Sequence, residues 1–263
     1  MTGFELTTNY LEQYRISCVP EVYYIPDFIT EHDEEYLLRK IHEAPQPMWR
    51  TLANRRSASP YSFPLARLQI WGGIIKNGVL VGQKLPDWLD KFPDLVTRLR
   101  DTGAFKSAKH GQPNHVIVNE YLAGQGIMPH EDGPAYHPVV GTISLGSHAV
   151  FNYYKYADAS TDDNAPSNNS NAGRAVDRTP LVSLLLKPRS LIITRSSLYT
   201  GHLHAIEERT QDVLGGDDGV KVANVHLVRA EEARTGGTLT RETRMSLTSR
   251  DVERVLDVER SGK

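Results

Sequence analysis

A histidine and an aspartate in the middle of the chain have the spacing of metal ligands. They are His130 and Asp132, in the segment His-Glu-Asp-Gly that ends at Gly133. Residues i and i+2 of a β-strand point to the same face, so both side chains can reach one metal ion. A second, distant histidine would complete a facial set of two histidines and one carboxylate, which holds non-haem Fe(II) and leaves coordination positions open. The alternative is an exposed histidine followed by an aspartate that caps a turn.

The spacing of the residues does not choose the second histidine. Its candidates lie downstream and are His148, His202, His204 and His226. His204 stands between apolar residues at the start of a predicted strand, and His202 shares its face if that strand begins early. A lone histidine is also often structural, so both assignments remain open at this point.

Two arginines near the C-terminal end fall on one face of another predicted strand. In the segment Arg244–Arg250 they alternate with Met245 and Leu247, and Ser246 shares their face. At roughly 3.3 Å per residue the two arginine Cα atoms are about 20 Å apart, so both cannot grip one carboxylate side by side. Guanidinium binds carboxylate in a planar fork, which suits one end of a dicarboxylate co-substrate. Together with the His-x-Asp pair, this strand predicts an Fe(II) oxygenase that consumes 2-oxoglutarate; the alternative is a solvated polar face.

The composition of the chain narrows its class. Its 263 residues fit one large domain with a substantial core, and its formal net charge of −2 gives no general signal for binding polyanions. A single cysteine, Cys18, excludes an internal disulfide framework and favours a reducing compartment. No apolar run approaches the roughly 20 residues of a membrane span. We therefore expect a soluble protein of the cytoplasm and nucleus with no membrane partner.

The order of the predicted elements indicates an α+β fold with helices first and strands later. A helix is predicted to begin after Thr30, where Asp33 completes a capping box, and a second near Pro86, which Pro93 would kink or split. Alternating, β-branched segments predict strands over residues 22–25, 115–122, 139–145, 149–156, 181–186, 191–194, 203–207, 222–228 and 243–248. Many short strands of this kind favour a double-stranded β-helix, or jelly roll.

The predicted domain boundaries follow from this pattern. We expect an N-terminal tail over 1–20, a helical and lid-like region over 21–113, the jelly-roll core over 114–252 and a C-terminal tail over 253–263. Residues 158–178, rich in Asp, Asn, Ser and Ala, predict a disordered insertion in the core. Residues 44–86, 211–219 and 231–237 are predicted to be loop-rich.

Two segments resemble the signatures of AlkB-type dioxygenases. The segment from Asn119 through Tyr121 and Gly124 to His130 and Asp132 is similar to Asn-x-Tyr-x-x-Gly-x5-His-x-Asp, and the segment 244–250 is similar to Arg-x-Asn-Leu-Thr-x-Arg. Residues 23–28, 68–73, 128–134 and 142–148 are most similar to the branch called AlkB homolog 6. The resemblance extends from about residue 22 to residue 252. One departure is Ser246, which stands where most of the family has Asn.

The resemblance implies a set of site residues. The iron ligands and catalytic centre would be His130, Asp132 and His204, because the family's distal histidine precedes a Gly/Ala-Ile/Val pair, as His204 does. Arg244 would bind the distal carboxylate of 2-oxoglutarate, and Arg250 would lie near the metal and steady Asp132 or the co-substrate. The implied co-substrate contacts are Asn119, Tyr121, Arg244, Ser246 and Arg250. Molecular oxygen would be the second co-substrate.

A basic and aromatic segment points to the substrate. Residues 44–86 contain no Asp or Glu, although the chain has 32 acidic residues in 263. Basic side chains suit phosphates and aromatic rings stack on bases. By resemblance this stretch corresponds to the family's nucleotide-recognition lid, with contacts from Trp49, Arg50, Arg55, Arg56, Arg67 and Trp71. The alternative is an ordinary basic surface loop with its aromatic rings packed on the core.

These features favour oxidative demethylation of N-alkylated bases, in RNA over single-stranded DNA, with release of succinate, CO2 and formaldehyde. Two alternatives remain. The first is an oxygenase or demethylase of the same fold that acts on protein side chains, because fold does not fix substrate. The second is a nucleic-acid-binding module with little turnover, against which every ligand position carries a competent residue.

Overall fold

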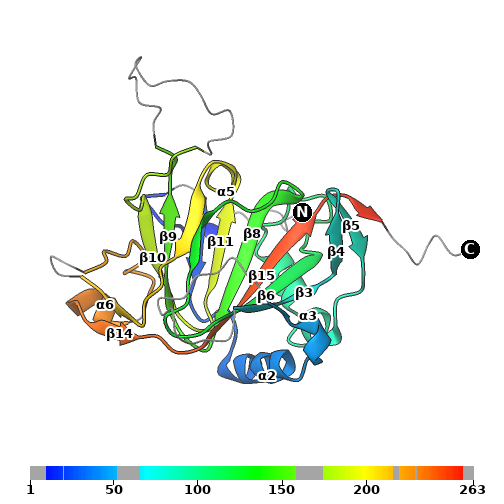
Figure 1. Ribbon diagram of the computed structural model, residues 1–263, viewed down its shortest axis with the longest axis horizontal. Helices are drawn as coiled ribbons and strands as arrows, with labels where there is room; N and C mark the ends of the chain where they lie inside the picture. The colour runs from blue at the N-terminus through cyan, green and yellow to red at the C-terminus, as the bar shows by residue number, and fades with distance from the viewer. Residues whose placement is uncertain are drawn as a thin grey trace, which may run out of the picture.

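Two β-sheets face each other in the core of the protein (Figure 1). The computed structural model describes residues 10–19, 21–51, 66–157, 174–215, 219–228 and 230–256. Within these ranges the chain forms the predicted α+β fold with a jelly-roll core. No helix in the described part of the chain is long and apolar enough to cross a lipid bilayer.

The larger sheet has seven antiparallel strands. Their spatial order is β1 (Val22–Ile25), β11 (Leu191–Arg195), β8 (Tyr136–Leu145), β15 (Arg244–Val252), β6 (His115–Tyr121), β3 (Arg67–Trp71) and β2 (Arg50–Thr51). The smaller sheet has the order β10 (Val182–Leu186), β9 (Ala149–Tyr154), β12 (Leu203–Ile206) and β7 (Ile127–His130). The strand that carries both signature arginines, β15, therefore lies in the middle of the larger sheet.

Three helices cover the outer face of the larger sheet. The helix α2 (Glu31–His42) begins at the predicted capping box, in which the Thr30 hydroxyl accepts from the Asp33 amide at 3.1 Å. The predicted second helix is split around Pro93 into α3 (Asp87–Asp90) and α4 (Leu95–Asp101). Their apolar side chains form one buried cluster with the outward residues of β6, β8 and β15. This layer leaves the inner face of the sheet for the site.

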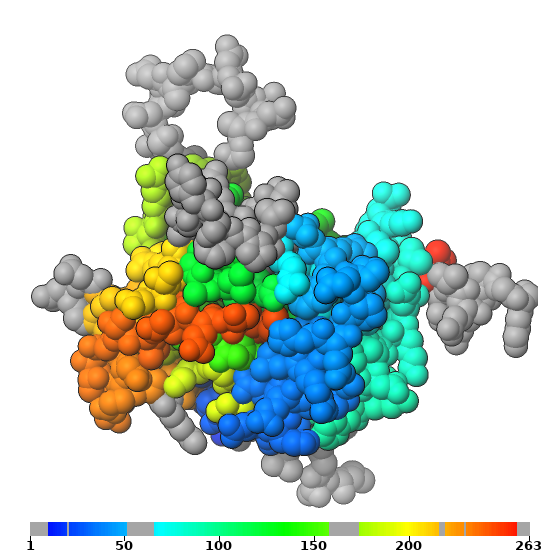
Figure 2. Space-filling view, turned by 60° about the horizontal axis from the view of Figure 1, so that its bottom comes forward, coloured from blue at the N-terminus to red at the C-terminus, as the bar shows by residue number. Residues whose placement is uncertain are grey.

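The region 44–86 is more regular than predicted. After a 3-10 turn (Gln46–Met48) and β2, the described residues form β3, β4 (Gly73–Lys76) and β5 (Val79–Gly82). The strand β3 pairs with β6 in the larger sheet, and β4 and β5 form a hairpin. Figure 2 shows the segment around residues 66–90, in turquoise, packed beside the blue N-terminal residues on one face. The prediction of a loop-rich segment was wrong for these residues, because pairing with a distant strand is not visible in local sequence.

Other corrections concern the second half of the chain. Residues 222–228, predicted as a strand, form turns, because the Asn224 side chain bonds both the amide and the carbonyl of Leu185 at 2.9 and 2.8 Å. The predicted loops contain β13 (Gln211–Val213) and α6 (Glu231–Thr235), and β14 (Thr238–Thr240) pairs with β13.

Two predicted irregular segments are partly ordered. Most of the predicted insertion, residues 158–173, lies outside the described residues, but Val176 forms a bridge with Tyr156. The expected C-terminal tail begins with β16 (Val255–Leu256), which pairs in parallel with β5. The C-terminal end of the described chain therefore lies against the β4–β5 hairpin.

Candidate metal centre and co-substrate pocket

Three side chains from two strands and a loop converge at one point between the sheets. They are His130, Asp132 and His204, whose ligand atoms all lie within 4.8 Å of one another. The strands β7 and β12 are neighbours, and His204 pairs directly with His130 in their register. The ring centroids of the two histidines are 4.2 Å apart. Within the described part of the chain, this is the one group of three or more potential ligands that could hold a metal ion.

The contact of His130 with a backbone carbonyl assigns the roles of its two ring nitrogens. Its Nδ1 atom lies 2.8 Å from the carbonyl oxygen of Met128, which can only accept a hydrogen bond. The proton therefore sits on Nδ1, and Nε2 is the nitrogen that can act as a metal ligand. The second histidine is also neutral, because burial lowers the pKa of His204 to about 3. The ring of Phe151 stacks on His204 with 5.4 Å between centroids and helps to fix its plane.

The aspartate is held in its charged form by a buried arginine. Burial by itself would raise the pKa of Asp132, but the positive charge of Arg250 and its hydrogen bond to the carboxylate hold that pKa below its usual range. Both side chains are 8 % exposed. The guanidinium of Arg250 also lies over the ring of Tyr136, at 5.0 Å from its centroid. One oxygen of Asp132 is thus engaged by Arg250 and the carboxylate stays ionised for a cation.

The three ligands line a cavity of about 830 Å³. One wall is the inner face of β15, where the predicted alternation is confirmed: Ser246 and Thr248 face the cavity with both arginines, while Met245 and Leu247 enter the outer core. Asn119 and Tyr121 of β6 line the same wall, opposite Ser246 and Arg244 in register. The opposite wall is largely apolar, formed by Ile127, Phe151 and Ile206 of the smaller sheet.

The β15 wall carries a second buried cation, Arg244, at the end away from Arg250. Arg244 is 3 % exposed, and its Nη2 atom donates to the Ser144 hydroxyl at 2.8 Å. Its guanidinium lies 5.4 Å from the centroid of the Tyr121 ring. A metal site at one end and a buried arginine at the other match a dicarboxylate that spans between them.

Comparison of sequences identifies the family. The sequence profile described as the 2OG-Fe(II) oxygenase superfamily matches residues 21–250. The chain belongs to this superfamily. Its members need Fe(II) and 2-oxoglutarate, and the two histidines, the carboxylate and the buried arginines described above are a donor set that fits both.

Individual relatives agree with the resemblance to AlkB-type dioxygenases. The chain is 38 % identical over 247 residues to a Danio rerio protein named probable RNA/DNA demethylase ALKBH6, a match that covers 94 % of this chain and 92 % of the relative. It is 25 % identical over 241 residues to the Xenopus tropicalis tRNA (carboxymethyluridine(34)-5-O)-methyltransferase alkbh8, covering 90 % of this chain and 32 % of that protein. The solved structure of OsALKBH1 has a TM-score of 0.50 and 15 % identity, covering 89 % of this chain and 99 % of that one, which shows a shared fold.

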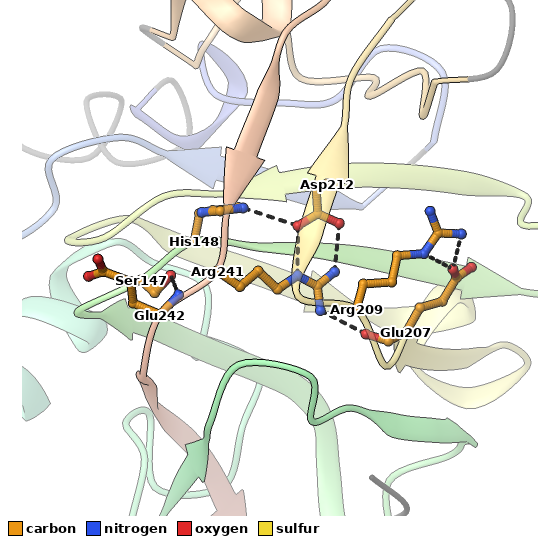
Figure 3. Close-up of polar contacts among 7 residues, drawn as sticks. All are labelled: Ser147, His148, Glu207, Arg209, Asp212, Arg241 and Glu242. Atoms are coloured by element: carbon orange, nitrogen blue, oxygen red, sulfur yellow. Dashed lines mark hydrogen bonds and ion pairs between the residues drawn. The ribbon is translucent and has the colours of Figure 1, made fainter. Parts of the chain in front are cut away.

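In this oxygenase, a buried polar network holds the segment that leads into Arg244 (Figure 3). Arg241 donates to both oxygens of Asp212 at 2.7 Å and to the Glu207 carbonyl at 2.7 Å. His148 bonds the same aspartate at 3.0 Å. We call these four residues the Arg241 clamp. It joins the start of β15 to β13 and to the end of β12, the strand of His204, so one network links the two halves of the site.

The other candidate histidines have different surroundings. His148 belongs to the clamp, His202 bonds the Ser197 carbonyl at 3.2 Å, and His226 is exposed in a turn. None of the three joins the metal cluster. The choice between His202 and His204, which local spacing left open, is therefore made by the pairing of β12 with β7.

The predicted lid residues are only partly in position to meet a ligand. Arg67 donates to both carboxylate oxygens of Glu120 at 2.7 Å and lies over Trp49 at 4.4 Å. Trp71 donates to Gln69 and packs edge-on against Trp88. Arg50 is exposed on β2. These four side chains do not line the large cavity, and Arg55 and Arg56 lie outside the described residues.

The sequence analysis assigned no role to several residues in and beside the pocket. Ser144 bonds Arg244, Tyr136 stacks under Arg250, Phe151 covers His204, and Tyr199 lines the cavity beside Arg250. Phe151 and Tyr199 lie outside the signature segments, whereas Tyr136 follows Asp132 by four residues and Ser144 lies within residues 142–148. The inward register of Ser144, opposite Ser246 across β8 and β15, is the one that strand alternation could have revealed.

Proposed function

We propose that this oxygenase oxidatively demethylates N-methylated bases of nucleic acid, with RNA preferred. The observation that carries the proposal is the match over 94 % of the chain to a probable RNA/DNA demethylase. The cavity of about 830 Å³ supports it, because this volume leaves room for a base beside the co-substrate. A base reaches such a pocket from a single strand or by leaving the stack.

The chain's own residues have distinct parts in this reaction. His130, Asp132 and His204 would hold Fe(II), and Arg244 with Ser144 and Tyr121 would hold the distal carboxylate of 2-oxoglutarate. Bound iron with 2-oxoglutarate and oxygen supplies the oxidising chemistry: one oxygen atom enters a substrate C–H bond and the other leaves in succinate, with CO2. An N-hydroxymethyl group formed in this way releases formaldehyde and restores the amine.

Neighbouring groups fix the charge, orientation and tautomer of the metal ligands and exclude water. Arg250 holds Asp132 charged and oriented, and the carbonyl of Met128 fixes the tautomer of His130. The apolar wall formed by Ile127, Phe151 and Ile206 excludes water from one side of the metal position. Glu131 and Pro134 line the cavity and are exposed, so the substrate would enter past them.

A protein substrate is the second candidate. Its support is the engagement of Arg67 by Glu120 and of Trp71 by Gln69 and Trp88, which removes two expected nucleic-acid contacts. A methylated lysine or arginine would then occupy the same cavity.

The test measures succinate and formaldehyde formed from 2-oxoglutarate with Fe(II), oxygen and ascorbate. Substrates are methylated tRNA, methylated single-stranded DNA and methylated histone peptides, and His204→Ala is the inactive control. We expect both products to rise with tRNA and to vanish in the variant. Formaldehyde from peptides alone would move the substrate to protein, and iron-dependent succinate with no formaldehyde from any of the three would contradict demethylation.

A further inference from the structure

The metal end of the pocket contains a tyrosine that the chemistry above does not use. Tyr199 lies on the short helix α5 (Ser196–Thr200), which connects β11 to β12 and packs against β8 and β11. Its side chain lines the cavity together with Asp132, Tyr136 and Arg250. The helix places this ring five positions before the ligand His204, so its location is fixed by the same connection that positions the ligand.

Two buried hydrogen-bond donors at the metal end of the pocket have no partner among the described residues. The Tyr199 hydroxyl is fully buried, and no described residue completes a hydrogen bond with it. The Nε atom of Arg250 is also buried and also has no hydrogen-bond partner among the described residues, although its Nη2 atom bonds Asp132. Arg250 is close enough to influence the pKa of Tyr199, yet the contact between them does not reach hydrogen-bond geometry.

Buried donors without partners are uncommon in folded proteins, because each gives up its bonds to water. Two of them on neighbouring side chains, both facing one cavity, indicate that a bound group completes them. Both groups can donate a hydrogen bond, and the positive charge of the guanidinium favours an acceptor that carries negative charge, such as a carboxylate oxygen. Burial and the nearby Asp132 carboxylate raise the pKa of Tyr199, so its hydroxyl keeps its proton at neutral pH.

The position of Tyr199 indicates which anionic group it would bind. Arg244, with Ser144 and Tyr121, occupies the other end of the cavity and suits the distal carboxylate of 2-oxoglutarate. Tyr199 lies instead beside the arginine that bonds a metal ligand. We propose that Tyr199 donates a hydrogen bond to the keto-acid carboxylate of 2-oxoglutarate and so positions the co-substrate at the metal. This role does not depend on which substrate is demethylated.

The test uses two inert ligands and the Mn(II)-loaded protein, so that no turnover is needed. N-Oxalylglycine has both carboxylates of 2-oxoglutarate. Succinate retains the distal carboxylate but is one carbon shorter, so its second carboxylate lies where 2-oxoglutarate has its keto carbon and nothing occupies the position of the keto-acid carboxylate. Titration calorimetry on Tyr199→Phe should show about a tenfold weaker Kd for N-oxalylglycine and less than about a twofold change for succinate. The melting temperature of the metal-free variant should equal that of the wild type or exceed it, because the hydroxyl has no partner to lose.

The matched control is Tyr24→Phe, which removes a buried hydroxyl that does not line the pocket and that accepts a hydrogen bond from the Lys187 amide. This control should lower the melting temperature and leave the Kd of N-oxalylglycine unchanged. An unchanged Kd of N-oxalylglycine in Tyr199→Phe would overturn the proposal. Equal weakening of both ligands would overturn it as well, since it would show that the ring only shapes the pocket.

Discussion

At the scale of single residues, the metal centre depends on contacts that each ligand makes away from the metal. The Met128 carbonyl occupies one nitrogen of His130, Arg250 holds the carboxylate of Asp132, and Phe151 stacks on His204. Such outer contacts fix ring orientation, tautomer and charge before a metal binds. The three ligands are therefore preorganised rather than gathered by the ion.

A histidine replacement tests the ligand set directly. His204→Gln should weaken Mn(II) or Fe(II) binding by more than about 100-fold, because a direct ligand matters at least as much as its outer contacts. The matched variant His202→Gln removes a histidine two positions away that bonds the Ser197 carbonyl, and it should bind metal like the wild type. Metal titration with the purified proteins measures both. Loss of binding in His202→Gln alone would show that the assignment is wrong.

At the scale of the elements, β15 organises the pocket because it lies between β8 and β6 and has two different faces. Met245 and Leu247 anchor one face under the helices, and the arginines and Ser246 present the other face to the cavity. The Arg241 clamp fixes where this strand begins. Gly146 contributes to that fit, since its φ is +77° and an added Cβ would meet the Thr243 carbonyl oxygen at 2.6 Å.

Breaking the clamp should cost stability and co-substrate affinity together. Asp212→Asn removes the charge that compensates Arg241, which is 6 % exposed, and should lower the free energy of unfolding by about 3 kcal/mol. N-Oxalylglycine should also bind more weakly, since Arg244 follows the clamp by three residues. Urea unfolding and titration measure the two effects. The control Asp87→Asn breaks an exposed ion pair with Lys91 and should leave the unfolding midpoint unchanged; a similar midpoint for both variants would contradict the clamp.

At the scale of the whole molecule, burying a polar pocket between two sheets makes folding dependent on pH. Two histidines are kept neutral by their surroundings: burial and then Arg250 lower the pKa of His115 to about 4, and burial lowers that of His204 to about 3. In the unfolded chain both would take up a proton near pH 6.5. As pH falls below that value, the two histidines bind protons in the unfolded state but not in the folded state.

These two histidines should therefore leave the free energy of unfolding of the metal-free protein unchanged above pH 7. Below about pH 6 they should lower it. The slope should reach up to about 1.4 kcal/mol per pH unit for each histidine, until the folded protein begins to bind protons near pH 4. Urea unfolding in EDTA between pH 7 and pH 4.5 measures it. His115→Gln should reduce the slope, whereas His226→Gln, in an exposed turn, serves as the control. A slope that is the same in the His115 variant would show that His115 is not a neutral buried group.

Sequence periodicity predicted those features that depend on neighbours along the chain. The alternation in the segment Arg244–Arg250 gave the inward and outward faces of β15 correctly, and the capping box at Thr30 gave the start of α2. The spacing of His130 and Asp132 also predicted two neighbouring ligands, although Asp132 lies in the loop after β7 and not on a strand as the prediction assumed. These inferences hold because a strand or a helix start has a fixed local geometry, whatever surrounds it.

By itself, then, the sequence determined the chemistry of this protein: two metal ligands and an arginine strand for a dicarboxylate. Which other residues join the site or contact its side chains was decided by the tertiary structure. It chose His204 over His202 through the pairing of β12 with β7, and it engaged Arg67 with Glu120, 53 positions away, instead of leaving it for a phosphate. It also brought Tyr199 beside Arg250. The physical reason is that these contacts arise from sheet pairing and burial between distant segments, which local periodicity does not encode.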